Sequence, residues 1–196
     1  MKGHVLIVAD GRSPTALSWI KNIQSLNYKV SLISSFQCEK PVGVDHFHIL
    51  PIAFSRFSTG TASPKKEGSG QRLKPFIKRF APLLQKFRYI LGPFSLLRFK
   101  GPYQNFVKEI DPDFVHALRI PFEGMLASYT PKDIPLIVAI WGNDLTLHAK
   151  GSWLMGKFTN QCLTRADGLT SDTRRDIRLA KEMGLKHKAP ALYVPG

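Results

Sequence analysis

The sequence predicts an α/β domain in which helices cover a mostly parallel β-sheet, giving three layers. Short apolar runs alternate with amphipathic segments along residues 1–196, as strands and their covering helices do. The run IPLIVAIW, residues 134–141, is almost wholly apolar, which is typical of a parallel strand buried on both faces. A chain of 196 residues is long enough to bury one core. We therefore expect one domain over residues 1–196.

The first strand is expected at residues 4–9, with the sequence HVLIVA. A helix should follow, with Ser13 as its N-cap and Pro14 at the first helical position, where a missing N–H costs nothing. Four apolar residues then recur at helical spacing and are expected to face the sheet: Trp19, Ile20, Ile23 and Leu26.

The remaining strands are expected at residues 29–34, 46–52, 113–118, 134–141, 167–171 and 191–195. A helix near residues 173–183 should end at Gly184, because glycine readily adopts the left-handed conformation that closes a helix. Strands alternating with helices indicate that the sheet is parallel.

Composition excludes several classes of protein. With 43% hydrophobic and 21% charged residues, the chain is neither fully disordered nor collagen-like. No apolar run approaches the roughly 20 residues that cross a bilayer, and the first residues do not resemble a secretory signal. Cys38 and Cys162 form neither a disulfide framework nor a metal motif. We expect a reducing, cytoplasmic location and no bound metal.

Positive charge is concentrated in one part of the chain. The whole chain has a formal net charge of +14, and residues 56–100 hold eleven Lys and Arg against one acidic residue, Glu67. This basic insertion is expected to begin with a mobile loop, residues 58–70, rich in Gly, Ser and Lys. A surface meeting an anionic partner would explain so local an excess.

An amphipathic helix is expected at residues 73–91, kinked or split at Pro82. Its apolar face consists of Phe76, Ile77, Phe80, Leu83, Leu84, Phe87, Ile90 and Leu91. The basic residues around that face are Lys74, Lys78, Arg79, Lys86 and Arg88. Three interpretations stay open: a helix packed on the sheet with solvated lysines, a helix docked on an anionic membrane, or a nucleic-acid surface, which no recognised motif supports.

The loop after the first strand contains Gly11, Arg12 and Ser13. A glycine turn before a helix N-terminus can approach a phosphate or a sugar oxygen. The spaced glycines of a dinucleotide fingerprint and the Gly-Lys-Ser/Thr of a Walker loop are both missing. The alternative is a plain connection between strand and helix.

Two further loops at strand ends hold polar groups. His116, Arg119 and Glu123 follow the strand at 113–118 and could together hold hydroxyls or phosphates, unless His116 is a structural residue inside the strand. Trp141, Gly142 and Asp144 follow the next strand; an indole can cover a sugar ring while a carboxylate accepts from its hydroxyls. Alternatively, Asp144 or its neighbour Asn143 only caps the next helix.

Ser171 and Arg174 follow a later strand, and a residue of this loop is expected to cap the helix that begins there. Arg174 is a candidate anion contact. His46 and His48 have no partners at metal-binding spacing and are interpreted as structural.

Five segments, in this order, resemble the N-terminal domain of the GT-B glycosyltransferases of family 4: LIVADGRSPTALSWIKNIQSL, DPDFVHALRIPFEGMLA, IPLIVAIWGNDL, RADGLTSDTRRDI and YVPG. The resemblance implies a Rossmann-like domain, the N-terminal half of a GT-B fold. A second domain, not contained in residues 1–196, would bind most of the nucleotide-sugar. Such enzymes are typically retaining and metal-independent, and need no cofactor besides the nucleotide-sugar donor.

The resemblance places Gly11, Arg12 and Ser13 near the donor phosphates and the acceptor. His116 matches the first histidine of the family's V-H-x-H strand end, and residues 141–144 match its H-G-x-D loop. Leu118 and Trp141 stand where the family often has histidines. We expect about 180 further residues with an E-x7-E pattern beyond Gly196, a domain's worth.

The expected function is acceptor binding in a hexosyltransferase that acts on a lipid-linked or polysaccharide precursor. Residues 1–196 alone should not catalyse transfer, and a peripheral position on the inner face of the membrane is one expected location. The alternatives are a non-enzymatic basic module binding an anionic membrane or nucleic acid, and a complete single-domain nucleotide binder. The transferase interpretation requires the loops at the strand ends to gather at one cleft.

Overall fold

A computed structural model describes the backbone of residues 2–53 and 74–194, and the side chains of residues 2–53 and 88–194. Seven strands form one sheet in the order β3-β2-β1-β4-β5-β6-β7, and every neighbouring pair is parallel. The strands are β1 (His4–Ala9), β2 (Lys29–Ser34), β3 (Phe47–Ile49), β4 (Phe114–Ala117), β5 (Leu136–Ile140), β6 (Gly168–Ser171) and β7 (Ala191–Tyr193). The predicted parallel α/β sheet is confirmed.

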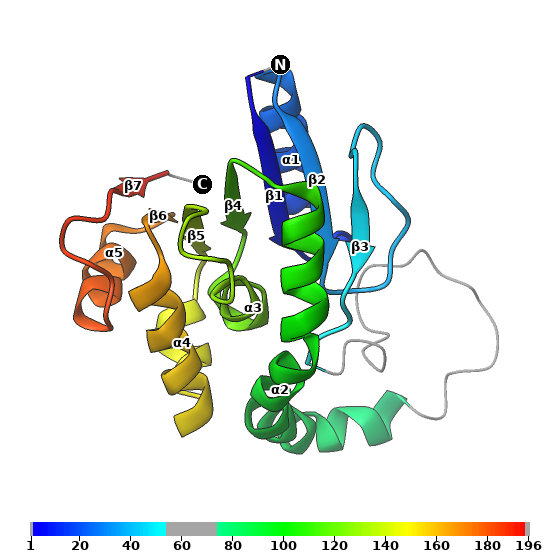
Figure 1. Cartoon of the computed structure of the whole chain (residues 1–196). Coiled ribbons are helices and arrows are strands. Elements are labelled where there is room, and N and C mark those ends of the chain that lie inside the picture. Colours follow the sequence, from blue (N-terminus) through cyan, green and yellow to red (C-terminus); the bar gives the residue numbers. More distant parts are fainter. Residues whose placement is uncertain (1, 54–73, 195–196) are drawn as a thin grey trace.

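Helices connect the strands and cover the sheet (Figure 1). They are α1 (Pro14–Ser25), α2 (Lys74–Ile110), α3 (Met125–Ala127), α4 (Trp153–Arg165) and α5 (Arg174–Glu182), with one-turn helices η2 (Ile120–Gly124) and η3 (Asp144–His148). The sequence predicted α1, α5, the first part of α2 and a helix after Asp144, where η3 begins, but not α4.

Two apolar clusters lie on the two sides of the sheet. One joins β1, β2 and α1 through residues such as Ile7, Ile20 and Leu32. The larger one joins the strands to α2, α3 and α4, with Leu6 and Met155 among its members. Strand residues alternate between the two clusters because successive side chains of a strand point to opposite faces. The three-layer, Rossmann-like arrangement is therefore present.

The first helix begins as predicted. Ser13 has the extended backbone of an N-cap, although its side chain makes no capping hydrogen bond. Leu26, expected to face the sheet, is exposed instead, because the helix ends at Ser25 and Leu26 already lies in the turn. The end of α5 is as predicted: Gly184 has a φ of +113°, in the region that favours glycine.

The basic insertion folds differently from the prediction. One helix, α2, runs from Lys74 to Ile110, well past the expected end at residue 91. Figure 1 shows α2 as successive helical stretches that change direction, as expected for a helix interrupted by prolines. The expected loop at 58–70 lies outside the described residues, as do the side chains of the expected apolar face up to Phe87. Among the described residues, no helix is long and apolar enough to span a membrane.

Candidate functional site

Polar side chains gather where parallel strands end. Because all seven strands run the same way, the loops after β1, β2, β4 and β5 lie at one edge of the sheet (Figure 1). This edge is where ligands of open α/β sheets bind. We call the following residues of these loops the strand-end cluster: Asp10, Arg12, Ser35, Arg119, Glu123 and Asp144.

Asp144 is fully buried and joins two loops of the strand-end cluster by hydrogen bonds. Its carboxylate accepts from Arg119 Nη2 at 3.1 Å and from Arg119 Nε at 3.3 Å. It also accepts from the backbone N–H groups of Ile120 (3.4 Å) and Trp141 (3.2 Å). Burial raises the pKa of Asp144, and Arg119 opposes the rise. Asp144 thus joins the loop after β4 to the loop after β5 and fixes the direction of the Arg119 guanidinium.

Glu123 is the second buried carboxyl of the cluster. Ser35 Oγ, from the loop after β2, donates to Glu123 Oε1 at 2.5 Å. Burial raises the pKa of Glu123, while this hydrogen bond and the charge of Arg119 lower it. The contact joins residues 88 positions apart in the sequence, so no local pattern could reveal it.

Arg88 approaches the cluster from α2. Its guanidinium carbon lies 4.9 Å from the centre of the Phe122 ring. Its Nε is buried and has no hydrogen-bond partner among the described residues. Burial lowers the pKa of Arg88, and Glu123 opposes that shift. The predicted place of Arg88 on a solvated membrane-facing surface is therefore wrong, since its head group lies against Phe122 and near Glu123. The side chains of Lys74, Lys78, Arg79 and Lys86 lie outside the described residues.

The loop after β1 is already hydrogen-bonded within the protein. The N–H of Gly11 donates to Ser34 Oγ, that of Arg12 to Asp10 Oδ1, and that of Ser13 to the Asp10 carbonyl. These three N–H groups are therefore not free to bind a phosphate as the sequence suggested. A Cβ on Gly11 would come within 2.7 Å of Cys38 Sγ, so close packing explains the glycine.

Arg12 is held by neighbours of its own. It forms an ion pair with Asp10 at 3.0 Å, and its guanidinium carbon lies 3.8 Å from the centre of the Phe36 ring. The hydrogen bond with Asp10 raises the pKa of Arg12. Among the arginines of the cluster, Arg119 has the more exposed side chain, at 43% against 23% for Arg12.

His116 does not belong to the cluster. The residue is 4% exposed, and its ring meets Trp19 of α1 edge to face, with ring centres 5.1 Å apart. Its Nε2 is buried without a hydrogen-bond partner, and burial lowers its pKa to about 4. The expectation that His116 lines an open cleft is wrong, because its position in β4 directs the ring into the α1 layer.

Trp141 packs, half-buried, against the apolar cluster of the α1 layer. It and His116 therefore lie on the same side of the sheet. Gly142 follows with a φ of +56°, and its N–H donates to Asp172 Oδ2 at 3.2 Å. Asp144 begins η3 but does not cap it with its side chain, so the capping alternative is wrong for this residue.

Ser171 and Arg174 are not brought into the cluster. Ser171 is buried, and its Oγ donates to the Thr173 carbonyl and accepts from the Thr173 N–H. Arg174 is exposed and lies over the ring of Tyr193 at 5.6 Å. Thr173 is the N-cap of α5, accepting from the Asp176 N–H, which confirms that this loop supplies a cap.

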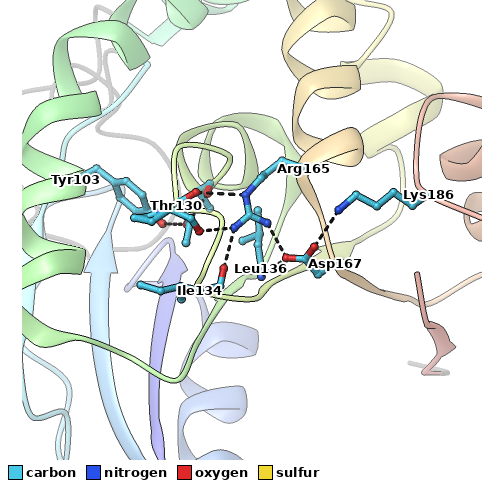
Figure 2. Close-up of polar contacts among 9 residues, drawn as sticks. Tyr103, Thr130, Ile134, Leu136, Arg165, Asp167 and Lys186 are labelled. Carbon is cyan, nitrogen blue, oxygen red and sulfur yellow. Dashed lines mark hydrogen bonds and ion pairs between the residues drawn. The ribbon is translucent and has the colours of Figure 1, made fainter. Parts of the chain in front are cut away.

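A second polar network stabilises the opposite edge of the sheet (Figure 2). Arg165, the last residue of α4, donates to three carbonyl oxygens of the loop before β5: those of Thr130, Pro131 and Ile134. Its Nη1 also contacts Asp167 Oδ2 at 2.6 Å, and Lys186 contacts the other oxygen of the same carboxylate at 3.0 Å. These contacts hold the start of β5 and are structural.

The chemistry available in the strand-end cluster is that of binding. Arg119 can donate several hydrogen bonds to a phosphate or carboxylate. Trp141, whose backbone N–H donates to the same Asp144 carboxylate as Arg119, carries a half-buried aromatic ring. Tyr89 Oη and His148 Nδ1, 2.7 Å apart, lie nearby and were missed by the sequence analysis, which had no pattern linking α2 to η3. Among the described residues there is no group of three or more His, Cys, Asp or Glu that could hold a metal ion.

Comparisons with known proteins bear on the fold. No family model matches the sequence, and no curated protein matches it either. UGT89C1 of Arabidopsis thaliana, solved in complex with UDP-L-rhamnose, is similar in structure, with a TM-score of 0.51 and 15% identity. The match covers 99% of this chain and 52% of UGT89C1.

MurG of Acinetobacter baumannii is also similar, with a TM-score of 0.46 and 12% identity over 99% of this chain and 46% of MurG. The chain thus spans about half the length of each protein. At such identities the likeness concerns the fold. This chain has the α/β Rossmann-like fold found in GT-B glycosyltransferases.

Proposed function

We propose that this chain is the acceptor-side domain of a retaining glycosyltransferase of family 4, which transfers a hexose from a nucleotide-sugar. One observation carries the proposal: Arg119 lies half-exposed at the ligand-binding edge of the sheet, held there by the fully buried Asp144. A buried carboxylate that aims a cation outward prepares a site for an anion. The fold shared with UGT89C1 supports the same class of enzyme.

Each residue has a distinct role in this proposal. Arg119 stabilises negative charge on a phosphate of the donor or of a lipid-linked acceptor. Trp141 covers one face of a sugar ring. Asp144 is a positioning residue, because its carboxylate already accepts hydrogen bonds from four donor atoms of the protein itself. Glu123 supplies negative charge near Arg119, and Arg88 adds a second cation there.

The remaining parts of the enzyme are proposed on the resemblance. A second Rossmann-like domain following this chain supplies most contacts to the nucleotide-sugar, and catalysis combines positioning of the two substrates with stabilisation of the departing nucleoside diphosphate. No metal ion is required. The acceptor is a lipid-linked or polysaccharide precursor in the cytoplasm.

The test is hexose transfer by the protein encoded by the complete reading frame, supplied with UDP-, GDP- or ADP-hexose and a lipid-linked acceptor. Arg119→Ala should lower kcat/KM by about 100-fold, as loss of one charge-stabilising donor does in other enzymes. Arg174→Ala is the matched control, because Arg174 is an exposed arginine outside the cluster, and it should change kcat/KM less than about twofold. Equal effects of the two changes in folded proteins would refute the role given to Arg119.

A further inference from the structure

The helix α2 has two apolar sides between Tyr89 and Leu97, and only one of them is covered. Tyr89 and Leu96 are buried in the larger core cluster. On the other side lie four large apolar residues that are 42–56% exposed: Ile90, Leu91, Phe94 and Leu97. A helix that is apolar all round normally has both sides buried, in a core or in lipid. The second side of α2 therefore requires a partner.

These four residues form one continuous surface, which we call the α2 stripe. Positions 90, 94 and 97 are spaced by four and three residues, so their side chains lie above one another on one side of the helix. Leu91 widens the stripe by one position. Single exposed apolar residues are ordinary on protein surfaces, but a row of four is the mark of an interaction site.

An exposed tryptophan lies where α4 begins beside α2. Ser152 Oγ donates to the Tyr89 carbonyl at 2.7 Å, which ties the start of α4 to the residue before the stripe. The next residue, Trp153, is 75% exposed. The ammonium of Lys157 lies 5.2 Å from the centre of its ring. An indole beside a lysine is well suited to the boundary between lipid headgroups and acyl chains.

The charge around the stripe has one sign. Arg98 is exposed and directly follows it, and no acidic residue occurs between Glu67 and Glu109. Lys150 and Lys157 flank Trp153, and residues 148–166 contain no acidic residue. A second copy of this chain would bring the same positive charge, which opposes self-association through this side. An anionic surface with an apolar interior complements both properties.

We propose that the α2 stripe and Trp153 form the face by which this protein docks onto an anionic lipid bilayer. The apolar side chains enter the boundary of the acyl region while the surrounding lysines and arginines meet anionic headgroups. This face differs from the basic surface predicted from the sequence, since it depends on Phe94, Leu97 and Trp153 and not on Arg88, whose guanidinium lies against Phe122.

Docking in this orientation would bring the strand-end cluster close to the bilayer. The first half of α2 lies at the edge of the sheet where the strand arrows end (Figure 1). Tyr89, the residue before the stripe, contacts His148 of η3, which begins at the cluster residue Asp144. The docking itself does not depend on the proposed transferase activity, and only its benefit for a lipid-linked acceptor does.

The test is sedimentation of the 196-residue chain with vesicles of phosphatidylcholine alone, or of phosphatidylcholine with 30% phosphatidylglycerol, at low and high salt, without any sugar or nucleotide. We expect binding to the anionic vesicles that weakens at high salt. The double change Phe94→Ser and Leu97→Ser should lower the partition coefficient at least about tenfold. The matched control, Leu26→Ser with Val42→Ser, removes exposed apolar side chains elsewhere and should change it less than about twofold.

A second measurement follows Trp153 directly. Its fluorescence should shift to shorter wavelength with anionic vesicles, and Trp153→Phe should abolish the shift while circular dichroism shows the same fold. Equal binding to both vesicle types, or equal losses in the two double variants, would overturn the proposal. So would concentration-dependent dimers that the Phe94→Ser and Leu97→Ser changes dissolve, because the partner would then be a second copy. Failure of sugar transfer would leave these results unaffected.

Discussion

Replacing His116 by phenylalanine should make the protein less sensitive to acid. In the folded protein the ring is buried against Trp19, and burial lowers its pKa from 6.5 to about 4. A proton on this ring would place a charge in an apolar layer, with Nε2 lacking a partner. Because the folded state binds this proton more weakly than the unfolded chain does, the stabilising effect is complete above pH 6.5 and is lost as the pH falls toward 4.

The size of the effect follows from the two pKa values. The interval from 6.5 to about 4 corresponds to between about 3 and 4 kcal/mol of unfolding free energy at ~1.4 kcal/mol for each pKa unit, of which about 3 kcal/mol is reached at pH 4. His116→Phe keeps an aromatic ring beside Trp19 but cannot take up a proton. The stability difference between the two proteins should therefore move by about 3 kcal/mol in favour of the variant between pH 7.5 and pH 4.

The assay is urea unfolding, followed by tryptophan fluorescence, at a series of pH values for both proteins. Burial also lowers the pKa values of His4 and His148, but these residues occur in both proteins and cancel in the difference. The comparison at pH 7.5 gives the change due to packing alone. A stability difference that stays constant with pH, or moves in favour of the wild type at low pH, would refute the burial of a neutral His116.

Three further changes test contacts that hold the sheet and the cluster. Arg165→Ala should lower the unfolding free energy by about 3 kcal/mol, because the carbonyl groups of the loop before β5 lose their donor. Lys186→Ala removes only an exposed ion pair and should lower it by less than about 1 kcal/mol. Equal losses of unfolding free energy in urea would contradict the network. Gly11→Ala should lower the unfolding free energy by about 2 kcal/mol, because the new Cβ crowds Cys38 Sγ, and Cys38→Ala added to it should recover part of the loss. A thermal unfolding midpoint that Gly11→Ala leaves unchanged would contradict this packing. Asp144→Ala should cost about 3 kcal/mol, since two backbone N–H groups lose their acceptor; a cost below about 1 kcal/mol would show that water replaces the carboxylate.

The sequence was sufficient to predict the sheet because parallel strands are marked locally. The strands β1, β2, β5 and β6 are apolar runs that end at or just before Asp, Ser or Gly, and six of the seven runs lie close to their expected positions. The third strand was predicted too long, at 46–52 against Phe47–Ile49, because edge pairing and not composition decides where a ladder ends. The end of α5 was predictable from Gly184 alone.

Long-range packing decided what the sequence did not reveal. Glu123 and Asp144 follow β4 and β5 in the sequence, but their burial depends on Ser35 and Arg119, which only the fold brings to them. His116 lies in β4, a strand that is buried on both faces. Its neighbours are apolar on both sides of the sheet, so no alternation of polar and apolar residues shows into which layer the His116 side chain points.

The length of α2 is the clearest case of tertiary packing overriding local signals. Gly92-Pro93 and Gly101-Pro102 are pairs that usually end helices. The helix continues because Leu96, Tyr103 and Val107 pack into the core, and Tyr103 Oη bonds Thr130 Oγ1 at 2.6 Å. Only Ile90 and Leu91 of the α2 stripe belonged to the predicted apolar face, because the predicted helix ended at residue 91 and left out Phe94 and Leu97.

The most direct test of the central claim is where a nucleotide-sugar contacts the chain. Amide chemical shifts of the labelled 196-residue protein should be followed during titration with UDP-, GDP- and ADP-glucose to millimolar concentrations. We predict saturable shifts at residues 119–124 and 141–144, no shifts at 130–136 around the Arg165 network, and weaker binding after Arg119→Ala. Shifts confined to the Arg165 edge, or shifts that Arg119→Ala leaves unchanged, would contradict a sugar-nucleotide site at the strand ends.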